Sequence, residues 1–138
     1  DPEMIGKTVC ALANGAILAE RDRAFMVWGV RDALGIRGGR EKVGTNISLE
    51  GMKKGGEDFQ NWLTRMLDPS IPLEFLEFQE GEYTYCIITI EPTYDRPVRF
   101  QNLEYIRIGE NVRPLKDSLP VLKKLQLQHI NGYSGNFL

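Results

Sequence analysis

The sequence has little of what defines several classes of protein. Its 138 residues include one histidine and two cysteines, and Cys10 and Cys86 each stand alone in an apolar stretch. Two isolated cysteines form neither a disulfide framework nor a zinc site, and they are typical of a reducing cytoplasm. The apolar runs are far shorter than the roughly 20 residues that a membrane-spanning helix needs. We therefore expect a cytoplasmic protein with no membrane partner.

Repeats, low-complexity tracts and an excess of one charge are also missing. The chain has 17 Lys and Arg against 19 Asp and Glu, a net charge of −2, and 42% of its residues are hydrophobic. These proportions are typical of one globular domain. We place this domain at residues 1–127 and expect 128–138 to be a flexible C-terminal tail. Because the sequence begins at Asp1 and not at methionine, we expect further domains in a full-length protein.

The hydrophobic pattern predicts both helices and strands. Apolar residues recur at helical spacing in three segments, 7–18, 57–67 and 119–127. Strands are expected at 24–30, 73–78, 83–90, 97–100 and 103–108. This order predicts an α+β fold, with one mixed, mostly antiparallel sheet of about 4–6 strands and about three helices.

The near-neutral total hides a segregation of charge. Residues 21–54 carry eight Lys and Arg against four acids, 57–95 carry nine acids and one basic residue, and 96–116 carry five basic residues against two acids. If the loop at 31–40 lies beside the strand that ends at Arg107, the two basic stretches form one face that attracts phosphate. The alternative is that these charges only solvate the surface.

The most specific string is 105–115, Tyr-Ile-Arg-Ile-Gly-Glu-Asn-Val-Arg-Pro-Leu, in which a strand enters a glycine turn. The forked guanidinium groups of Arg107 and Arg113 suit phosphate oxygens, and Asn111 can bond a base or a sugar. The string therefore predicts a nucleic-acid site. With the loop arginines, the predicted contact residues are Arg31, Arg37, Arg40, Arg107, Asn111, Arg113 and Lys116.

Several strings together resemble the Schlafen-type, Alba-like DNA-binding domain family. Its pattern includes a helix reading K-x-x-C-A-x-A-N, a strand ending G-V-D-D, the element G-N-E-x-x-x-W-L, a Pro-Val strand and Y-I-R-x-G-S. The matching segments are 7–14, 27–32, 56–63, 97–98 and 105–109. The resemblance covers most of the chain, from about Lys7 to Leu119. It implies a mixed α/β domain that binds nucleic acid, with DNA favoured over RNA, in transcriptional-regulator-like proteins of bacteria and archaea.

The resemblance also raises the question of an enzyme, because Schlafen relatives include metal-dependent ribonucleases. Their acidic trio comes from an opening strand, E-x-x-x-x-E-F-K, and from the acid of G-V-D. Only Asp32 corresponds to that trio here, Arg31 replaces an acid, and the context of Glu3 does not match. Phosphodiester cleavage needs two or three converging carboxylates around the metal. The sequence therefore favours a binding domain with neither metal nor cofactor, and Asp32 is its one weak catalytic candidate.

The aromatic residues and the lone histidine have ordinary structural interpretations. We expect Trp28 and Trp62 in the core rather than stacked on bases, and His129 on the surface. Three tyrosines suit either cross-strand packing or a stacking platform for bases, namely Tyr83, Tyr85 and Tyr105. No GxxxxGK[ST] string is present, so the chain has no Walker-type ATP site of its own.

Two other functions stay open at this point. The first is a Schlafen-like endoribonuclease that is complete only with an N-terminal acidic strand. The second is a protein-interaction module or a homodimer. It would pair through the short edge strand at 97–100, or it would present to a basic partner the acidic hairpin that we expect around Gly81, between the strands at 73–78 and 83–90.

Overall fold

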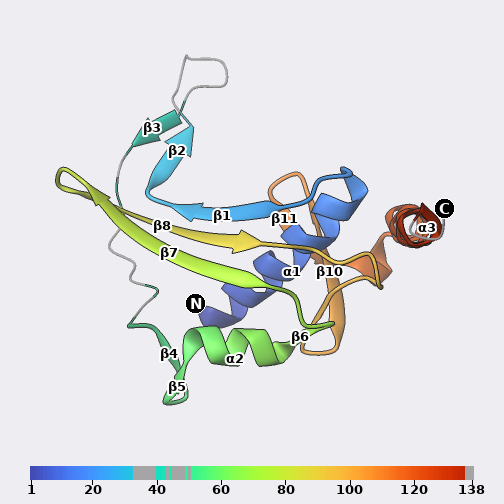
Figure 1. Cartoon of the computed structure of the whole chain (residues 1–138), viewed down its shortest axis with the longest axis horizontal. Coiled ribbons are helices and arrows are strands. Elements are labelled where there is room, and N and C mark those ends of the chain that lie inside the picture. Colours follow the sequence, from blue (N-terminus) through green and yellow to red (C-terminus); the bar gives the residue numbers. More distant parts are fainter. Residues whose placement is uncertain (33–39, 43, 45–48, 50, 136–138) are drawn as a thin grey trace.

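A long N-terminal helix, α1 (Pro2–Leu18), runs through the middle of the structure and contacts strands of both larger sheets (Figure 1). The computed structural model describes residues 1–32, 40–42, 44, 49 and 51–135. The Asp1 side chain caps α1 by accepting a hydrogen bond from the Glu3 backbone nitrogen at 2.9 Å. The helix begins before the expected start at residue 7, and it includes Pro2 because proline is tolerated in the first turn of a helix. The helix also continues through Asn14 and Gly15, because its buried face is packed along its whole length.

The first sheet has the strand order β1–β8–β7, with β1 (Ala24–Trp28) and β7 (Leu73–Glu80) on either side of β8 (Tyr83–Ile90). Cys86, Ile88 and Ile90 of β8 are buried on the face that meets the helices. As predicted, β7 and β8 form a hairpin around Gly81.

The second sheet has the order β11–β10–β9–β6. Its strands are β6 (Leu67–Asp68), β9 (Arg99–Phe100), β10 (Leu103–Ile108) and β11 (Asn111–Pro114). Two short ladders join β2 (Val30–Asp32) to β3 (Arg40–Lys42) and β4 (Lys53–Lys54) to β5 (Glu57–Asp58). Every strand pair among the described residues is antiparallel. The α+β class is therefore confirmed, with its strands divided between sheets instead of forming one.

The predicted strand at 24–30 is interrupted at Gly29, after which β2 pairs with β3 instead of β8. Gly29 has a φ of 99°, a conformation that side-chain-bearing residues rarely adopt. A Cβ atom there would also lie 2.8 Å from a ring carbon of Tyr85. The chain therefore turns out of the first sheet at a position that only glycine accommodates.

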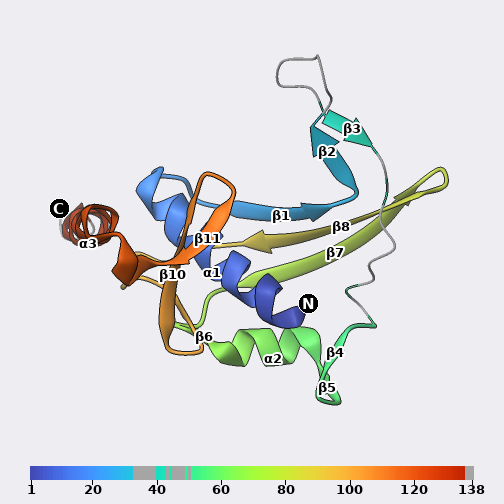
Figure 2. The ribbon, with the colours of Figure 1, turned by 180° about the vertical axis from the view of Figure 1, so that it is seen from behind.

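Helix α2 (Phe59–Met66) covers part of the inner face of the first sheet (Figure 2). Its N-cap is Asp58, whose carboxylate accepts hydrogen bonds from the next backbone nitrogens. Trp62 packs against Phe59 and, edge-on, against Phe100, with ring centroids 5.8 and 5.7 Å apart. The core role predicted for Trp62 is confirmed, and Trp28 is half-buried against the same cluster.

The C-terminal helix is longer than predicted. After a short 3₁₀ turn (Leu115–Asp117), α3 runs from Leu119 to Gly135, through most of the segment expected to be a flexible tail. Leu125 is fully buried in a small second cluster with Ile17 and Ile106. His129, predicted on the surface, is also buried, and its Nδ1 lies 2.9 Å from the Leu125 carbonyl oxygen. No helix in the described part of the chain is long and apolar enough to cross a membrane.

Candidate nucleic-acid interface

The helix motif K-x-x-C-A-x-A-N joins α1 to the second sheet. Asn14 is fully buried, and its amide nitrogen donates to the carbonyl oxygens of Val98 at 3.0 Å and Tyr105 at 2.8 Å. Its amide oxygen accepts from the Val98 nitrogen at 2.8 Å, and the Cys10 thiol donates to the Val98 oxygen at 3.2 Å. These hydrogen bonds from Asn14 hold the start of the second sheet, and the strand β10 that carries Arg107, against α1.

The β10–β11 hairpin sends the two predicted arginines to opposite faces. Arg107 is in register with Val112, and Ile106 is in register with Arg113. Because directly opposed residues share a face of the sheet, Arg107 lies on the face of Val112 and Arg113 on the face of Ile106. Both arginines are exposed. The structure therefore does not place Arg107 and Arg113 side by side.

Arg107 and Asn111 line one groove of about 490 Å³ between the hairpin, α1 and the edge strand β1. The Arg107 Nε donates to the Gly109 carbonyl oxygen at 3.1 Å, which steadies the side chain across its own turn. Thr8 of α1 and Phe25 of β1 also line the groove. The sequence does not identify Thr8 or Phe25 as site residues, because nothing in it shows which residues of α1 and β1 lie beside the hairpin. The groove combines one guanidinium, an amide, a hydroxyl and an exposed aromatic ring.

Lys116 lies elsewhere, in a second groove of about 330 Å³ between β10 and α3. Arg99 lines the same groove, and its Nε is 3.3 Å from a carboxylate oxygen of Glu104. The structure thus adds Arg99 near Lys116, but the ion pair with Glu104 offsets the charge of that arginine.

The remaining predicted residues belong to the β2–β3 region. Asp32 is in register with Arg40, and Arg31 with Glu41, in the short β2–β3 ladder. Arg37 lies outside the described residues. Figures 1 and 2 show β2 and β3 rising beyond the C-terminal end of β1, whereas the β10–β11 turn lies over its other half. The two basic stretches are therefore separated along β1.

Of the two carboxylates that the sequence raised as metal ligands, the Asp32 side chain lies outside the described part of the structure. Across the described residues, no three His, Cys, Asp or Glu side chains are placed to hold a metal ion. Glu3 instead lies 3.5 Å from the Lys54 ammonium. The cysteines are buried as well, and desolvation raises the pKa of the Cys10 thiol to about 12, well away from a reactive thiolate.

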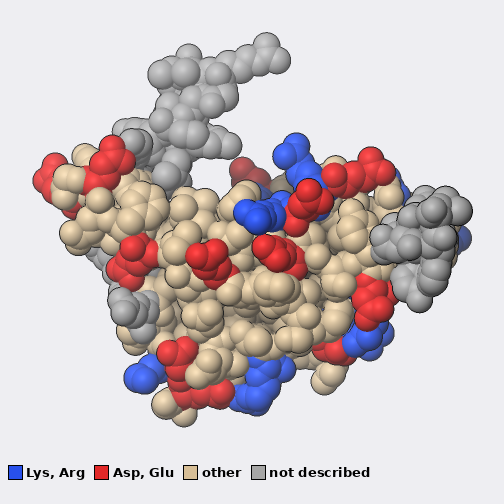
Figure 3. Space-filling view, in the orientation of Figure 1, with Lys and Arg blue, Asp and Glu red and all other residues tan. Residues whose placement is uncertain are grey.

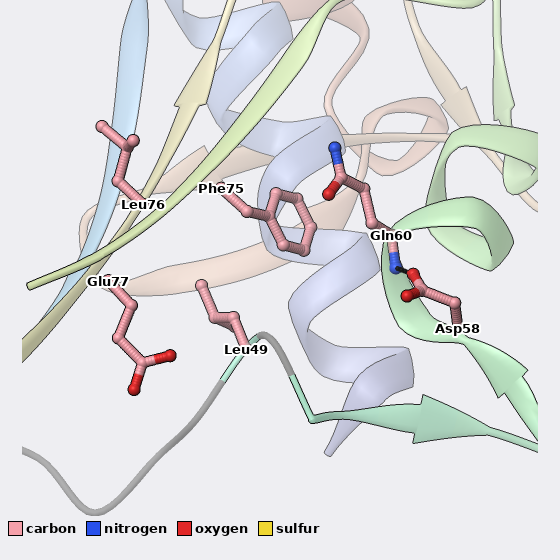
Figure 4. A pocket seen from close by; sticks show the side chains of 6 residues that line it. All are labelled: Leu49, Asp58, Gln60, Phe75, Leu76 and Glu77. Atoms are coloured by element: carbon pink, nitrogen blue, oxygen red, sulfur yellow. Dashed lines mark hydrogen bonds between the residues drawn. The ribbon is translucent and has the colours of Figure 1, made fainter.

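A third hollow, of about 380 Å³, lies between β7 and the start of α2 (Figure 4). Its apolar wall includes Leu49 and Phe75, and its polar groups include the carboxylates of Asp58 and Glu77. Asp58 caps its own helix, as the dashed line to Gln60 in Figure 4 shows. Two carboxylates repel phosphate, so this hollow does not suit a nucleic-acid backbone.

Two of the three tyrosines pack within the fold. Tyr85 is 2% exposed and its ring lies 5.3 Å from that of Phe78, while Tyr105 is 9% exposed beside Asn14. Tyr83 is exposed at the start of β8. Cross-strand packing is therefore the observed role of Tyr85, and these three residues do not form a shared platform for bases.

Comparison with known protein families matches residues 1–116 to the family described as Schlafen, AlbA_2. No curated protein and no solved structure matches the chain. The fold and the match place the chain in a class of nucleic-acid-related α+β domains. The chain belongs to the Schlafen AlbA_2 family, and this confirms the resemblance drawn from its sequence motifs.

Proposed function

We propose that this domain binds DNA through the groove between α1, β1 and the β10–β11 hairpin, within a transcriptional-regulator-like protein that has further domains. The family supports a nucleic-acid partner. The observation that carries the choice of site is the Arg107 guanidinium in this groove, where the Gly109 carbonyl holds it and Asn111 lines the groove beside the turn. A guanidinium held in place loses less conformational freedom when it binds a phosphate.

Each group in the groove has a separate role in this proposal. Arg107 binds a backbone phosphate with the guanidinium nitrogens that the Gly109 carbonyl leaves available, since Nε is its donor to that oxygen. Asn111 donates to sugar or phosphate oxygens, whereas the Thr8 hydroxyl donates its proton to the Met4 carbonyl oxygen at 2.8 Å and only lines the groove. Glu110 lines the same groove and repels phosphate, which lowers the affinity.

The test is fluorescence anisotropy of the purified chain with labelled duplex DNA, single-stranded DNA and RNA, each at low and near-physiological salt. Duplex DNA should bind most tightly. Arg107→Ala should weaken it about tenfold or more, since a hydrogen bond to a charged group contributes roughly 1.5–3 kcal/mol. If Arg107 contacts one phosphate, the slope of log affinity against log salt should also fall by about 0.9.

Arg96→Ala is the matched control, because it removes the same charge from an exposed arginine that pairs with Asp68 and Asp95 away from the groove. Arg113→Ala separates the two faces of the hairpin and should weaken binding less than Arg107→Ala. Equal affinities for Arg107→Ala and Arg96→Ala would exclude the groove as the binding site. Absence of binding at low salt would exclude DNA binding by this chain.

A further inference from the structure

The outer face of the first sheet exposes several apolar side chains, while Tyr85 on the same face is buried. Val27, Ile87 and Leu76 form one row across β1, β8 and β7, and Phe78 lies one row further along β7 on the same side. Val27, Leu76 and Phe78 are 44%, 42% and 45% exposed, and Ile87 is half-buried. We call these four residues the outer sheet face. The helices α1 and α2 pack on the opposite side. An apolar patch of this kind marks a site of protein interaction.

Acidic side chains border the outer sheet face. Glu74 occupies the next row, beside Thr89, and Glu82 lies in the β7–β8 turn. Both are exposed, and neither forms an ion pair with a described residue. Figure 3 shows acidic side chains over β7 and near this turn, with uncharged surface between them. This charge disfavours nucleic acid and favours a partner that combines apolar and basic side chains.

Helix α3 carries such a surface. Leu119, Leu127 and Ile130 are 61%, 59% and 60% exposed, and helical spacing places them on one stripe together with the exposed Lys123. Lys124 is exposed beside the stripe, and neither lysine forms an ion pair with a described residue. We call Leu119, Lys123, Leu127 and Ile130 the α3 stripe. Helix α3 lies wholly beyond residues 1–116, which the family match covers.

We propose that the outer sheet face of one copy of this chain binds the α3 stripe of a second copy. The two surfaces complement each other in charge, with lysines opposite Glu74 and Glu82, and both present apolar side chains that water otherwise solvates. A helix cannot reach the sheet of its own copy, because Leu125 anchors α3 to Ile17 and Ile106 at the end of the molecule away from the β7–β8 turn (Figures 1 and 2).

Two such contacts, related by a two-fold axis, close a dimer and leave no surface free for a chain of copies. In this dimer the α3 stripe of each protomer contacts the outer sheet face of the other. Val27 also lines the groove proposed for DNA, whereas Leu76 and Leu127 lie outside it. Dimer formation is therefore tested at Leu76 and Leu127, separately from DNA binding through Arg107.

Analytical ultracentrifugation over a range of concentrations measures the dimer dissociation constant. Leu76→Arg disrupts the outer sheet face and Leu127→Glu disrupts the α3 stripe. Each should raise the dissociation constant about a hundredfold or more, because the substitution removes one buried leucine from each of the two contacts in the dimer. Asn61→Arg is the matched control for Leu76→Arg, because it adds the same charge at an exposed position on α2 outside the hollow that Leu76 lines, and it should leave the constant unchanged. Added salt should weaken the wild-type dimer.

The decisive measurement mixes the two variants. A mixed dimer has one contact with neither substitution and one contact with both, in which the introduced arginine meets the introduced glutamate. This opposite-charge pair offsets part of the cost, so the mixture should form mixed dimers at concentrations where each variant alone is monomeric. A variant that failed to fold could not restore association in this way.

Four results would overturn the proposal. The first is a wild-type chain that stays monomeric at the highest concentration. The second is an unchanged dissociation constant in Leu127→Glu, which indicates that the sheet faces of the two copies pair with each other. The third is an unchanged dissociation constant in Leu76→Arg, which indicates that the α3 helices of the two copies pair with each other. The fourth is a Leu76→Arg variant that still forms the dimer but no longer binds single-stranded nucleic acid.

Discussion

Replacing Asn14 with alanine should destabilise the domain strongly, because that amide satisfies backbone groups that have no substitute partner. Val98 lies just outside β9, so its N–H has no strand partner and donates to the Asn14 oxygen at 2.8 Å. Tyr105 is in register with Pro114, which has no N–H to give, and its carbonyl accepts from Asn14 at 2.8 Å. The Val98 carbonyl retains the Cys10 thiol as a donor.

The magnitude follows from these two groups. Each buried backbone group left without a partner costs about 1–3 kcal/mol, so Asn14→Ala should lose about 2–6 kcal/mol of unfolding free energy. That is a large share of the roughly 5–15 kcal/mol that holds a domain folded. A loss of about 3 kcal/mol lowers the Tm of a chain of this size by roughly 10 °C.

Urea unfolding followed by tryptophan fluorescence and circular dichroism measures this loss. Asn14→Leu separates hydrogen bonding from packing, because leucine fills a similar volume and bonds to nothing; it should also be strongly destabilised. Asn61→Ala, at an exposed position of α2, is the control and should stay within about 0.5 kcal/mol of wild type. If Asn14→Leu were as stable as wild type, the hydrogen bonds would not be the cause and the reasoning would be refuted.

Two further predictions concern the same helix. Gly6→Ala should destabilise the domain by about 1–3 kcal/mol, because the new Cβ would lie 2.2 Å from a ring carbon of Phe100. Gly15→Ala should stabilise it by about 0.5–1 kcal/mol, because the new Cβ would meet nothing within 4 Å. Thermal melts compare the two, and equal effects would contradict the close packing at Gly6. Burial raises the pKa of Cys10 to about 12, so its thiol should stay unreactive toward a thiol reagent at pH 8 until urea unfolds the chain. Because the thiol of the unfolded chain ionises near pH 9, the free energy of unfolding should fall as the pH rises from 9 toward 12. Labelling of Cys10 in the native protein at the rate of a free thiol would contradict the raised pKa.

The Asn14 contacts also explain what the family's helix motif does. Cys10 and Asn14 are four residues apart on one face of α1, and both reach the Val98 carbonyl. Their role in this chain is structural, because both side chains are fully buried beneath the second sheet. The motif therefore identifies the fold, and the groove that we propose for DNA is built from other residues.

Local patterns in the sequence were sufficient for most of the elements. The apolar stripe of α2 predicted a helix with Trp62 in the core, and the aromatic and β-branched run at 83–90 predicted a strand, which is the central one of the first sheet. The order and spacing of the motifs predicted the family, which the match over residues 1–116 confirms. Hydrophobic periodicity records burial, so it is strong wherever one face of an element meets the core.

The location of the predicted site depended on long-range contacts that periodicity does not record. Arg107 and Arg113 both flank the glycine turn in sequence, but the β10–β11 register sends them to opposite faces. Likewise, the α3 helix extends past Leu127 because tertiary packing buries Leu125 and His129, whereas its local sequence shows only a weak pattern. The sequence by itself determined the class, the family and most of the elements. Only the tertiary structure decided which charged side chains share a groove and which apolar faces stay uncovered, because residues distant in sequence form both.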